Sequence, residues 1–160
     1  MRAAVLTVSD GVDAGERGDR SGDLLEELLR EDDFDVVRRV VPDDRDTIRA
    51  VLAELAGEAS LVLTTGGTGF APRDVTPEAT REVLDREAPG LAEAIRADAA
   101  TRTPHALLSR GLAGLRGGTL IVNLPGSTGG CRDGYAVLRP ALRHGLELAA
   151  GETATPHRQT

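Results

Sequence analysis

The sequence has few aromatic residues, one cysteine and no lysine. Aromatics make up 2% of its 160 residues, so the core must be built from Val, Leu, Ile and Ala, and the chain lacks the aromatic platforms on which nucleic-acid bases stack. The single Cys131 excludes an intrachain disulfide and a cysteine-rich zinc site. All 19 cationic side chains are arginine, which excludes a Walker-type phosphate loop and Schiff-base chemistry, because both need lysine.

The overall composition is that of a soluble globular protein. The chain is 40% hydrophobic and 28% charged, and it is long enough to bury a core as one domain. Its formal net charge of −7 argues against general binding to nucleic acid or to a membrane surface. No apolar run has the length of a membrane span, and Met1 leads into a predicted strand rather than a signal peptide. We therefore expect a cytoplasmic protein with no nucleic-acid or membrane partner, one domain over residues 1–151 and a mobile tail over residues 152–160.

The hydropathy pattern predicts strands that alternate with amphipathic helices. The expected strands cover residues 2–9, 34–41, 61–65 and 119–124, and expected helices cover residues 21–31, 76–86, 91–100 and 133–150. A further helix is expected after Asp44 or Asp46, with Ile48, Val51, Leu52 and Leu55 on one face. Thr76 is expected to cap the third helix with Pro77 at its first position, and Pro89-Gly90 to stop it. Residues 103–115 are ambiguous because Pro104 and Gly111 interrupt them, and a turn plus a short strand is one interpretation. Such alternation is typical of an α/β fold with a mostly parallel sheet covered on both faces.

The segment after the third predicted strand is the most informative part of the chain. It consists of Thr65, Gly66, Gly67, Thr68 and Gly69, followed by Arg73 and Asp74. Glycines let backbone N–H groups turn toward a phosphate, and the threonine hydroxyls can donate hydrogen bonds. Arg73 can neutralise negative charge, and Asp74 can hold a metal ion. This order predicts a pocket for a phosphorylated ligand, with magnesium.

Two aspartates follow neighbouring predicted strands. Asp43 and Asp74 are about one βα crossover apart, so both can reach the same crevice beyond the carboxyl ends of the strands. Magnesium prefers one or two carboxylates, with phosphates and water completing its octahedron. The alternative is that Asp43 only caps the following helix, for which Asp44 and Asp46 are equally good candidates.

A second glycine-rich turn, containing Pro125, Gly126 and Ser127, stands between the last predicted strand and helix. Its N–H groups and the Ser127 hydroxyl can hold a second anion at the start of the helix. Together with the first loop it predicts a two-lobed pocket. The dinucleotide-binding fingerprint is absent, and no histidine stands at a metal-ligand or hydrolase-triad spacing.

The chain resembles the MoaB/Mog family of molybdenum cofactor biosynthesis. The resemblance rests on Thr-Thr-Gly-Gly-Thr-Gly at residues 64–69, Arg-Asp-Val-Thr-Pro-Glu-Ala at residues 73–79 and Leu-Pro-Gly-Ser at residues 124–127, with further likeness at residues 85–91 and 108–118. It implies a three-layer α/β/α sandwich and assembly into homotrimers or homohexamers. It also implies a place beside the molybdenum-insertion enzyme of the pathway.

Adenylyltransferase members of this family join AMP from Mg-ATP to the terminal phosphate of molybdopterin and release pyrophosphate. By resemblance, Asp43 and Asp74 match the family's two functional aspartates, which position magnesium and nucleotide. The contacts to the pterin and its phosphate would come from residues 65–69 and from Pro125, Gly126 and Ser127, with Ser9 and Asp10 at the pocket edge. ATP and molybdopterin are then substrates, and Mg²⁺ is the cofactor.

The two glycine-rich loops resemble different branches of the family. The first loop, with Arg73 and Asp74, resembles the adenylyltransferase branch, whereas residues 125–132 resemble the MoaB branch, in which some members lack adenylyl transfer. Two alternatives to the enzyme follow: a non-catalytic molybdopterin-binding or scaffolding oligomer, and an unrelated nucleotide-binding α/β protein.

Overall fold

The computed structural model of the chain describes residues 1–151, and the predicted mobile tail at residues 152–160 lies outside them. Six strands form one sheet in the order β2-β1-β3-β6-β5-β4. β2, β1, β3 and β6 run parallel, whereas β5 and β4 add an antiparallel edge. The bounds are β1 (Arg2–Val8), β2 (Asp35–Val41), β3 (Leu61–Thr65), β4 (Arg86–Glu87), β5 (Ala113–Arg116) and β6 (Thr119–Leu124).

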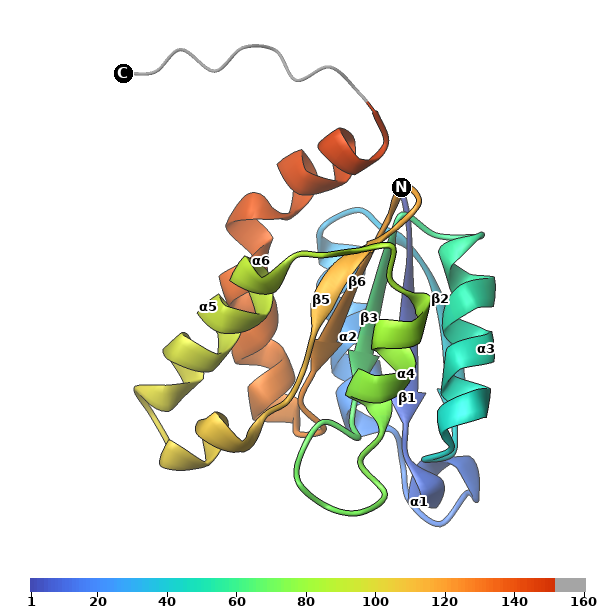
Figure 1. Cartoon of the computed structure of the whole chain (residues 1–160), viewed down its shortest axis with the longest axis vertical. Coiled ribbons are helices and arrows are strands. Elements are labelled where there is room, and N and C mark those ends of the chain that lie inside the picture. Colours follow the sequence, from blue (N-terminus) through green and yellow to red (C-terminus); the bar gives the residue numbers. More distant parts are fainter. Residues whose placement is uncertain (152–160) are drawn as a thin grey trace.

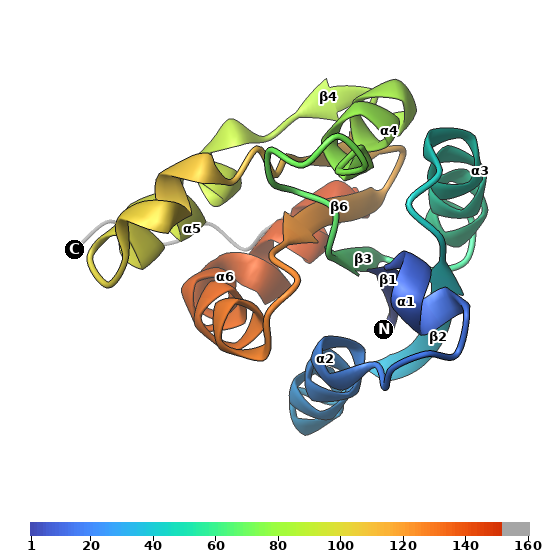
Figure 2. The same cartoon turned by 90° about the horizontal axis from the view of Figure 1, so that it is seen from below.

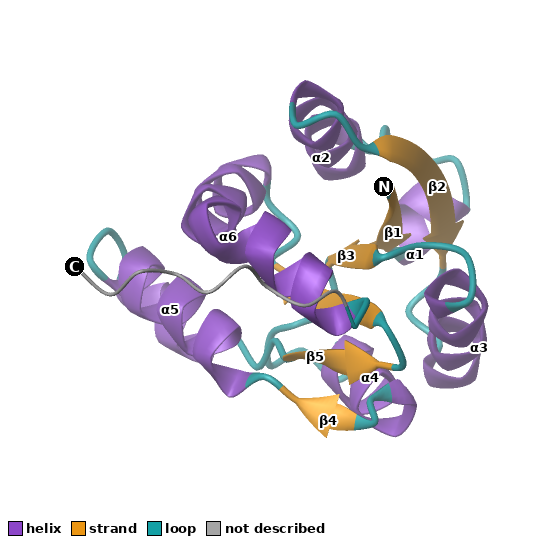
Figure 3. Ribbon diagram, turned by 90° about the horizontal axis from the view of Figure 1, so that it is seen from above, coloured by secondary structure: helices purple, strands orange, loops and turns teal. Residues whose placement is uncertain are grey.

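Helices cover both faces of this sheet, as the views along it show (Figures 2 and 3). They are α1 (Asp10–Asp13), α2 (Arg20–Glu31), α3 (Arg45–Ala56), α4 (Thr76–Val83), α5 (Pro89–Ala100) and α6 (Thr128–Ala149), with a 3₁₀ turn η1 (Pro104–Leu108). α2, α5 and α6 lie on one face, and α3 and α4 lie on the other. The predicted three-layer sandwich with a mostly parallel sheet is confirmed.

Each face of the sheet has its own hydrophobic core, because successive side chains of a strand point to opposite sides. In β1, Ala3 and Val5 pack toward α2 and α6, whereas Ala4 and Leu6 pack toward α3 and α4. All four are fully buried. A strand buried on both faces needs a continuous apolar run, and this is why the central strands could be recognised in the sequence.

α4 begins at Thr76 as predicted, but its predicted capping residue and its predicted end are wrong. Val75 holds the N-cap position without a side-chain bond, and the Thr76 hydroxyl instead donates to the Gly66 carbonyl at 3.0 Å. The helix ends at Val83 because the chain then enters β4, which pairs with β5. Pro89 starts α5 rather than stopping α4, a position that suits a residue without an N–H group.

The last helix begins earlier than predicted, at Thr128 rather than Asp133. The Ser127 hydroxyl accepts a hydrogen bond from the Gly130 N–H at 3.1 Å and so caps the helix. The four-residue α1 was not predicted. The ambiguous residues 103–115 contain η1 and β5, a turn followed by a short strand.

The carboxyl ends of β1, β2, β3 and β6 meet at one edge of the sheet, where α1 and the loop after β3 lie in Figure 1. From this edge the chain crosses to α2 and α6 on one face and to α3 and α4 on the other. In residues 1–151, no helix combines the length and the apolar character that crossing a membrane requires.

Candidate active site

A cavity of about 500 Å³ opens at this carboxyl edge. It lies where ligands bind in open parallel sheets. Its walls come from the segments that follow β1, β2, β3 and β6. It is lined by Thr7, Val8, Ser9, Val12, Arg17, Gly18, Asp19, Arg20, Ser21, Asp43, Thr65, Gly66, Gly67, Asp74, Gly126, Ser127 and Thr128.

The floor of the cavity is the sharp turn at Gly66 and Gly67. Both glycines have positive φ angles, 101° and 68°, which side chains strongly disfavour. A Cβ on Gly66 would lie 2.3 Å from the Val8 carbonyl oxygen, and a Cβ on Gly67 would lie 2.4 Å from Thr76 Oγ1. The first glycine therefore lets the loop pass against the end of β1, and the second lets it pass against the start of α4.

The rest of this loop is held by Arg110, which the sequence analysis did not single out. Its Nε donates to the Gly69 carbonyl and its Nη2 to the Asp74 carbonyl, both at 2.8 Å. Its Nη1 pairs with the Glu78 carboxylate at 2.8 Å, and its own N–H donates to the Thr68 carbonyl. Arg110 lies in the Leu-Ser-Arg-Gly stretch of the family resemblance, which was the only available signal.

Asp43 and Asp74 both line the cavity, so the two aspartates reach the same crevice, as their separation of about one βα crossover predicted. Asp43 and Asp10 bind reciprocally: the Asp10 N–H donates to Asp43 Oδ2 at 2.9 Å, and the Asp43 N–H donates to Asp10 Oδ1 at 3.0 Å. Asp74 Oδ2 accepts from the Ala71 N–H at 3.0 Å. In both Asp43 and Asp74 the other oxygen, Oδ1, accepts no hydrogen bond from residues 1–151 and is available to a ligand.

Partial burial raises the pKa of Asp43 above the usual Asp range, and the negative charges of Asp10 and Asp74 raise it further. The hydrogen bond from the Asp10 N–H acts in the opposite direction. A cation bound between the carboxylates would offset this repulsion.

Arg73 faces Asp10 rather than the cavity. Its Nε donates to Asp10 Oδ2 at 2.6 Å and its Nη2 to Asp10 Oδ1 at 3.0 Å. This bidentate pair lowers the pKa of Asp10. Neither residue lines the cavity, so Arg73 joins the loop after β3 to α1.

The second predicted loop forms the wall on the α6 side. Thr65 connects it to the first loop, because its hydroxyl donates to the Pro125 carbonyl at 2.8 Å and lies 3.0 Å from Ser21 Oγ. Cys131 lies below this contact, 3.1 Å from the Pro125 carbonyl. Burial raises the pKa of its thiol to about 11, so Cys131 is neutral and structural.

A second cavity of about 370 Å³ lies on the other side of the Pro125–Ser127 turn, against α5 and η1. Thr68, Gly69 and Pro125 line this second cavity and not the first, while Ser127 borders both. Of the residues predicted to form the site, the first cavity thus brings together Ser9, Asp43, Thr65, Gly66, Gly67, Asp74, Gly126 and Ser127.

The carboxylates of Asp43 and Asp74 fit a magnesium ion whose remaining ligands come from a bound phosphate group and water. Within residues 1–151, no group of three or more His, Cys, Asp or Glu side chains could hold a metal ion by itself. Asp43 and Asp74 offer hard carboxylate oxygens, and glycines leave room beside both. A Cβ at Gly67 would lie 3.3 Å from Asp43 Oδ1, and one at Gly69 would lie 2.9 Å from Asp74 Oδ2. Such a pair suits an ion whose other ligands are phosphate oxygens and water.

The fold and the cavity define an α/β protein with carboxylates and glycine-rich loops at the carboxyl edge of a parallel sheet. A family model described as a probable molybdopterin binding domain matches residues 4–144. The chain belongs to this family of molybdenum cofactor biosynthesis proteins.

Solved and curated relatives agree with this assignment. The chain is 50% identical to the crystal structure described as the molybdopterin biosynthesis enzyme MoaB from Thermus thermophilus, with a TM-score of 0.88 over 94% of this chain and 96% of that one. It is 38% identical to the molybdopterin adenylyltransferase of Helicobacter pylori, over 94% of this chain and 89% of that protein. It is 41% identical to the molybdenum cofactor synthesis protein cinnamon of Drosophila melanogaster over 94% of this chain, but spans only 26% of that protein.

Proposed function

We propose that this chain is a molybdopterin adenylyltransferase. The observation that supports this most directly is the placement of Asp43 and Asp74 in the cavity that the Gly66-Gly67 turn and Ser127 also line. Relatives of nearly the same length carry this name. In the proposed reaction, a terminal phosphate oxygen of molybdopterin attacks the α-phosphorus of ATP. The bond to the bridging oxygen of the leaving group then breaks, and pyrophosphate departs.

No protein nucleophile is needed for this reaction, so the chain's contribution is positioning and neutralisation of charge. Asp43 and Asp74 would hold the magnesium ion, which neutralises phosphate charge when bound. The backbone at Gly66 and Gly67 can approach a phosphate closely, because no Cβ stands between. Arg110 keeps the Asp74 segment in place through the Gly69 and Asp74 carbonyls.

A second candidate is a non-catalytic pterin-binding oligomer of the MoaB branch. It is favoured by the turn at residues 125–132, which resembles that branch, and by the high identity to the Thermus MoaB structure. We include in the proposal a homotrimer or homohexamer, a cytoplasmic location and transfer of the product to the molybdenum-insertion enzyme.

The test is pyrophosphate release from a mixture of the purified protein, molybdopterin, ATP and Mg²⁺. The enzyme releases pyrophosphate only when both substrates and the metal are present. If the protein binds the pterin, as monitored by its fluorescence, but releases no pyrophosphate, the adenylyltransferase proposal fails and the pterin-binding oligomer takes its place.

A further inference from the structure

The charges around the first cavity are divided between the two faces of the sheet. Asp43 and Asp74 belong to the segments that lead to α3 and α4, whereas Arg17 precedes α2, on the opposite face, and Arg20 is its first residue. Figure 2 shows the two groups of helices on either side of the strands. The two carboxylates proposed to hold the cation and the two arginines therefore come from segments that lead to opposite faces of the sheet.

Neither Arg17 nor Arg20 forms an ion pair within the described chain. Most arginines in residues 1–151 pair with Asp or Glu. Over the same residues, Arg17 forms no ion pair and donates only to Ser9 Oγ, at 2.8 Å, and Arg20 has neither an ion pair nor a hydrogen bond from its side chain. Both line the cavity, so their positive charge is available to an anion there.

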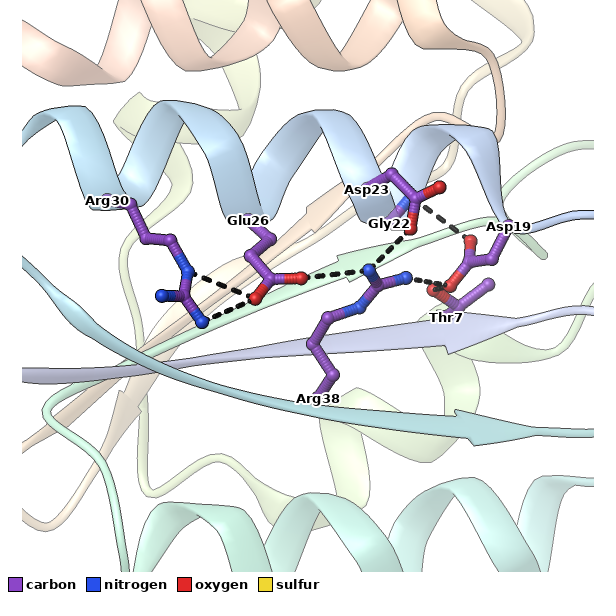
Figure 4. Close-up of polar contacts among 7 residues, drawn as sticks. All are labelled: Thr7, Asp19, Gly22, Asp23, Glu26, Arg30 and Arg38. Atoms are coloured by element: carbon purple, nitrogen blue, oxygen red, sulfur yellow. Dashed lines mark hydrogen bonds and ion pairs between the residues drawn. The ribbon is translucent and has the colours of Figure 1, made fainter.

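Asp19 stands between the two arginines in the sequence, but its carboxylate is fully engaged elsewhere (Figure 4). It accepts from the Thr7 hydroxyl at 2.7 Å and from the Gly22 N–H at 3.1 Å. Its Oδ2 also pairs with Arg38, whose Nη2 lies 2.5 Å away, and the same guanidinium pairs with Asp23 and Glu26. This network explains why Asp19 does not capture either neighbouring arginine.

Neutral donors lie on the same side of the cavity. Ser21 is in the first turn of α2, and Ser127 and Thr128 are at the start of α6, and all three line the cavity. The beginnings of these helices add partial positive charge to that of the arginines.

We propose that the α2 side of the cavity is a phosphate subsite in which Arg17 and Arg20 bind phosphate groups of the substrates, while Asp43 and Asp74 hold the cation on the other side. This deepens the proposed function and rests on it for the identity of the phosphorylated ligand. Binding of the phosphate groups by the arginines keeps the negative charge of the ligand away from the carboxylates that would repel it.

Pyrophosphate binding measured by calorimetry tests the subsite without turnover. In EDTA, where the carboxylates cannot act through a metal, the wild-type protein should bind pyrophosphate. Arg17→Gln and Arg20→Gln should each weaken binding about tenfold, the effect of losing one charge-assisted hydrogen bond, and the double variant should weaken it further. The matched control is Arg86→Gln, because Arg86 on β4 also has no ion pair in the described chain but lies at the far edge of the sheet.

The subsite is refuted if wild-type protein does not bind pyrophosphate in EDTA, if both single variants bind it as wild type does, or if Arg86→Gln loses as much affinity. The proposed function can fail separately. If no adenylylation occurs but pyrophosphate binding depends on Arg17 and Arg20, the subsite is supported and the proposed adenylyltransferase activity is refuted. In an active protein, an increased KM of Arg20→Gln for ATP assigns the subsite to the nucleotide, and an increased KM for molybdopterin assigns it to the pterin phosphate.

Discussion

Arg110 gives the sharpest test of how the loop carrying Asp74 is held. Arg110→Met keeps the length of the side chain but removes its hydrogen bonds to the Gly69 and Asp74 carbonyls and its ion pair with Glu78. Charge-assisted hydrogen bonds contribute about 1.5 kcal/mol each at the lower end of their range, and a partly exposed ion pair adds less than about 1 kcal/mol.

The side chain of Arg110 is 36% exposed, so water will replace part of what is lost. We therefore expect a loss of about 2–4 kcal/mol in the free energy of unfolding, or about 5–12 °C in Tm for a chain of this size. Urea denaturation measures the loss as a lower midpoint with an unchanged m-value. Hydrogen exchange should also become faster at residues 68–74.

The matched control is Arg45→Met, which removes an exposed ion pair with Glu82. Such a pair contributes less than about 1 kcal/mol. If Arg110→Met destabilises the protein no more than Arg45→Met does, or leaves exchange at residues 68–74 unchanged, Arg110 does not hold the loop as the hydrogen bonds indicate.

Three further predictions concern single residues. Gly66→Ala should destabilise the protein by several kcal/mol and abolish pterin binding, because its Cβ would lie 2.3 Å from the Val8 carbonyl oxygen at a φ of 101°; calorimetry checks both. Asp43→Asn should raise Tm at pH 7, because the folded state raises the pKa of Asp43 and so disfavours its charged form. This gain should disappear in melts at progressively lower pH, as the wild-type carboxyl becomes protonated. Cys131, whose thiol has a pKa of about 11, should react with a thiol reagent only at the rate of unfolding, and fast reaction of the folded protein would contradict its burial.

The main elements of the fold could be predicted because they carry strong local signals. β1, β3 and β6 each contain a run of at least three apolar residues, and α2 and α3 have one apolar face. The missed or misplaced elements depend on tertiary contacts: β4 has two residues and exists through its pairing with β5. The first turn of α6 contains Gly129 and Gly130, which are weak helix formers. The helix nevertheless begins at Thr128, because Ser127 caps it.

The convergence of Asp43, Asp74 and the two glycine-rich turns could also be predicted, since the carboxyl ends of parallel strands share one edge. The ion-pair partner of each arginine could not be predicted, because it depends on which carboxylate the fold brings close to the guanidinium. Arg73 is paired with Asp10, far away in the sequence, whereas Arg17 and Arg20 remain free of ion pairs in the described chain although Asp19 is beside them. Charge patterns in the sequence do not distinguish a paired arginine from an available one.

We propose that Asp74 makes this protein an adenylyltransferase, and Asp74→Asn tests this role most directly. Pyrophosphate release should be measured with saturating molybdopterin, ATP and Mg²⁺, and pterin affinity should be measured in parallel. We predict that the variant binds the pterin with unchanged affinity and loses turnover by about a hundredfold or more, the scale of a lost electrostatic group in a transition state. Wild-type turnover in Asp74→Asn would contradict the claim.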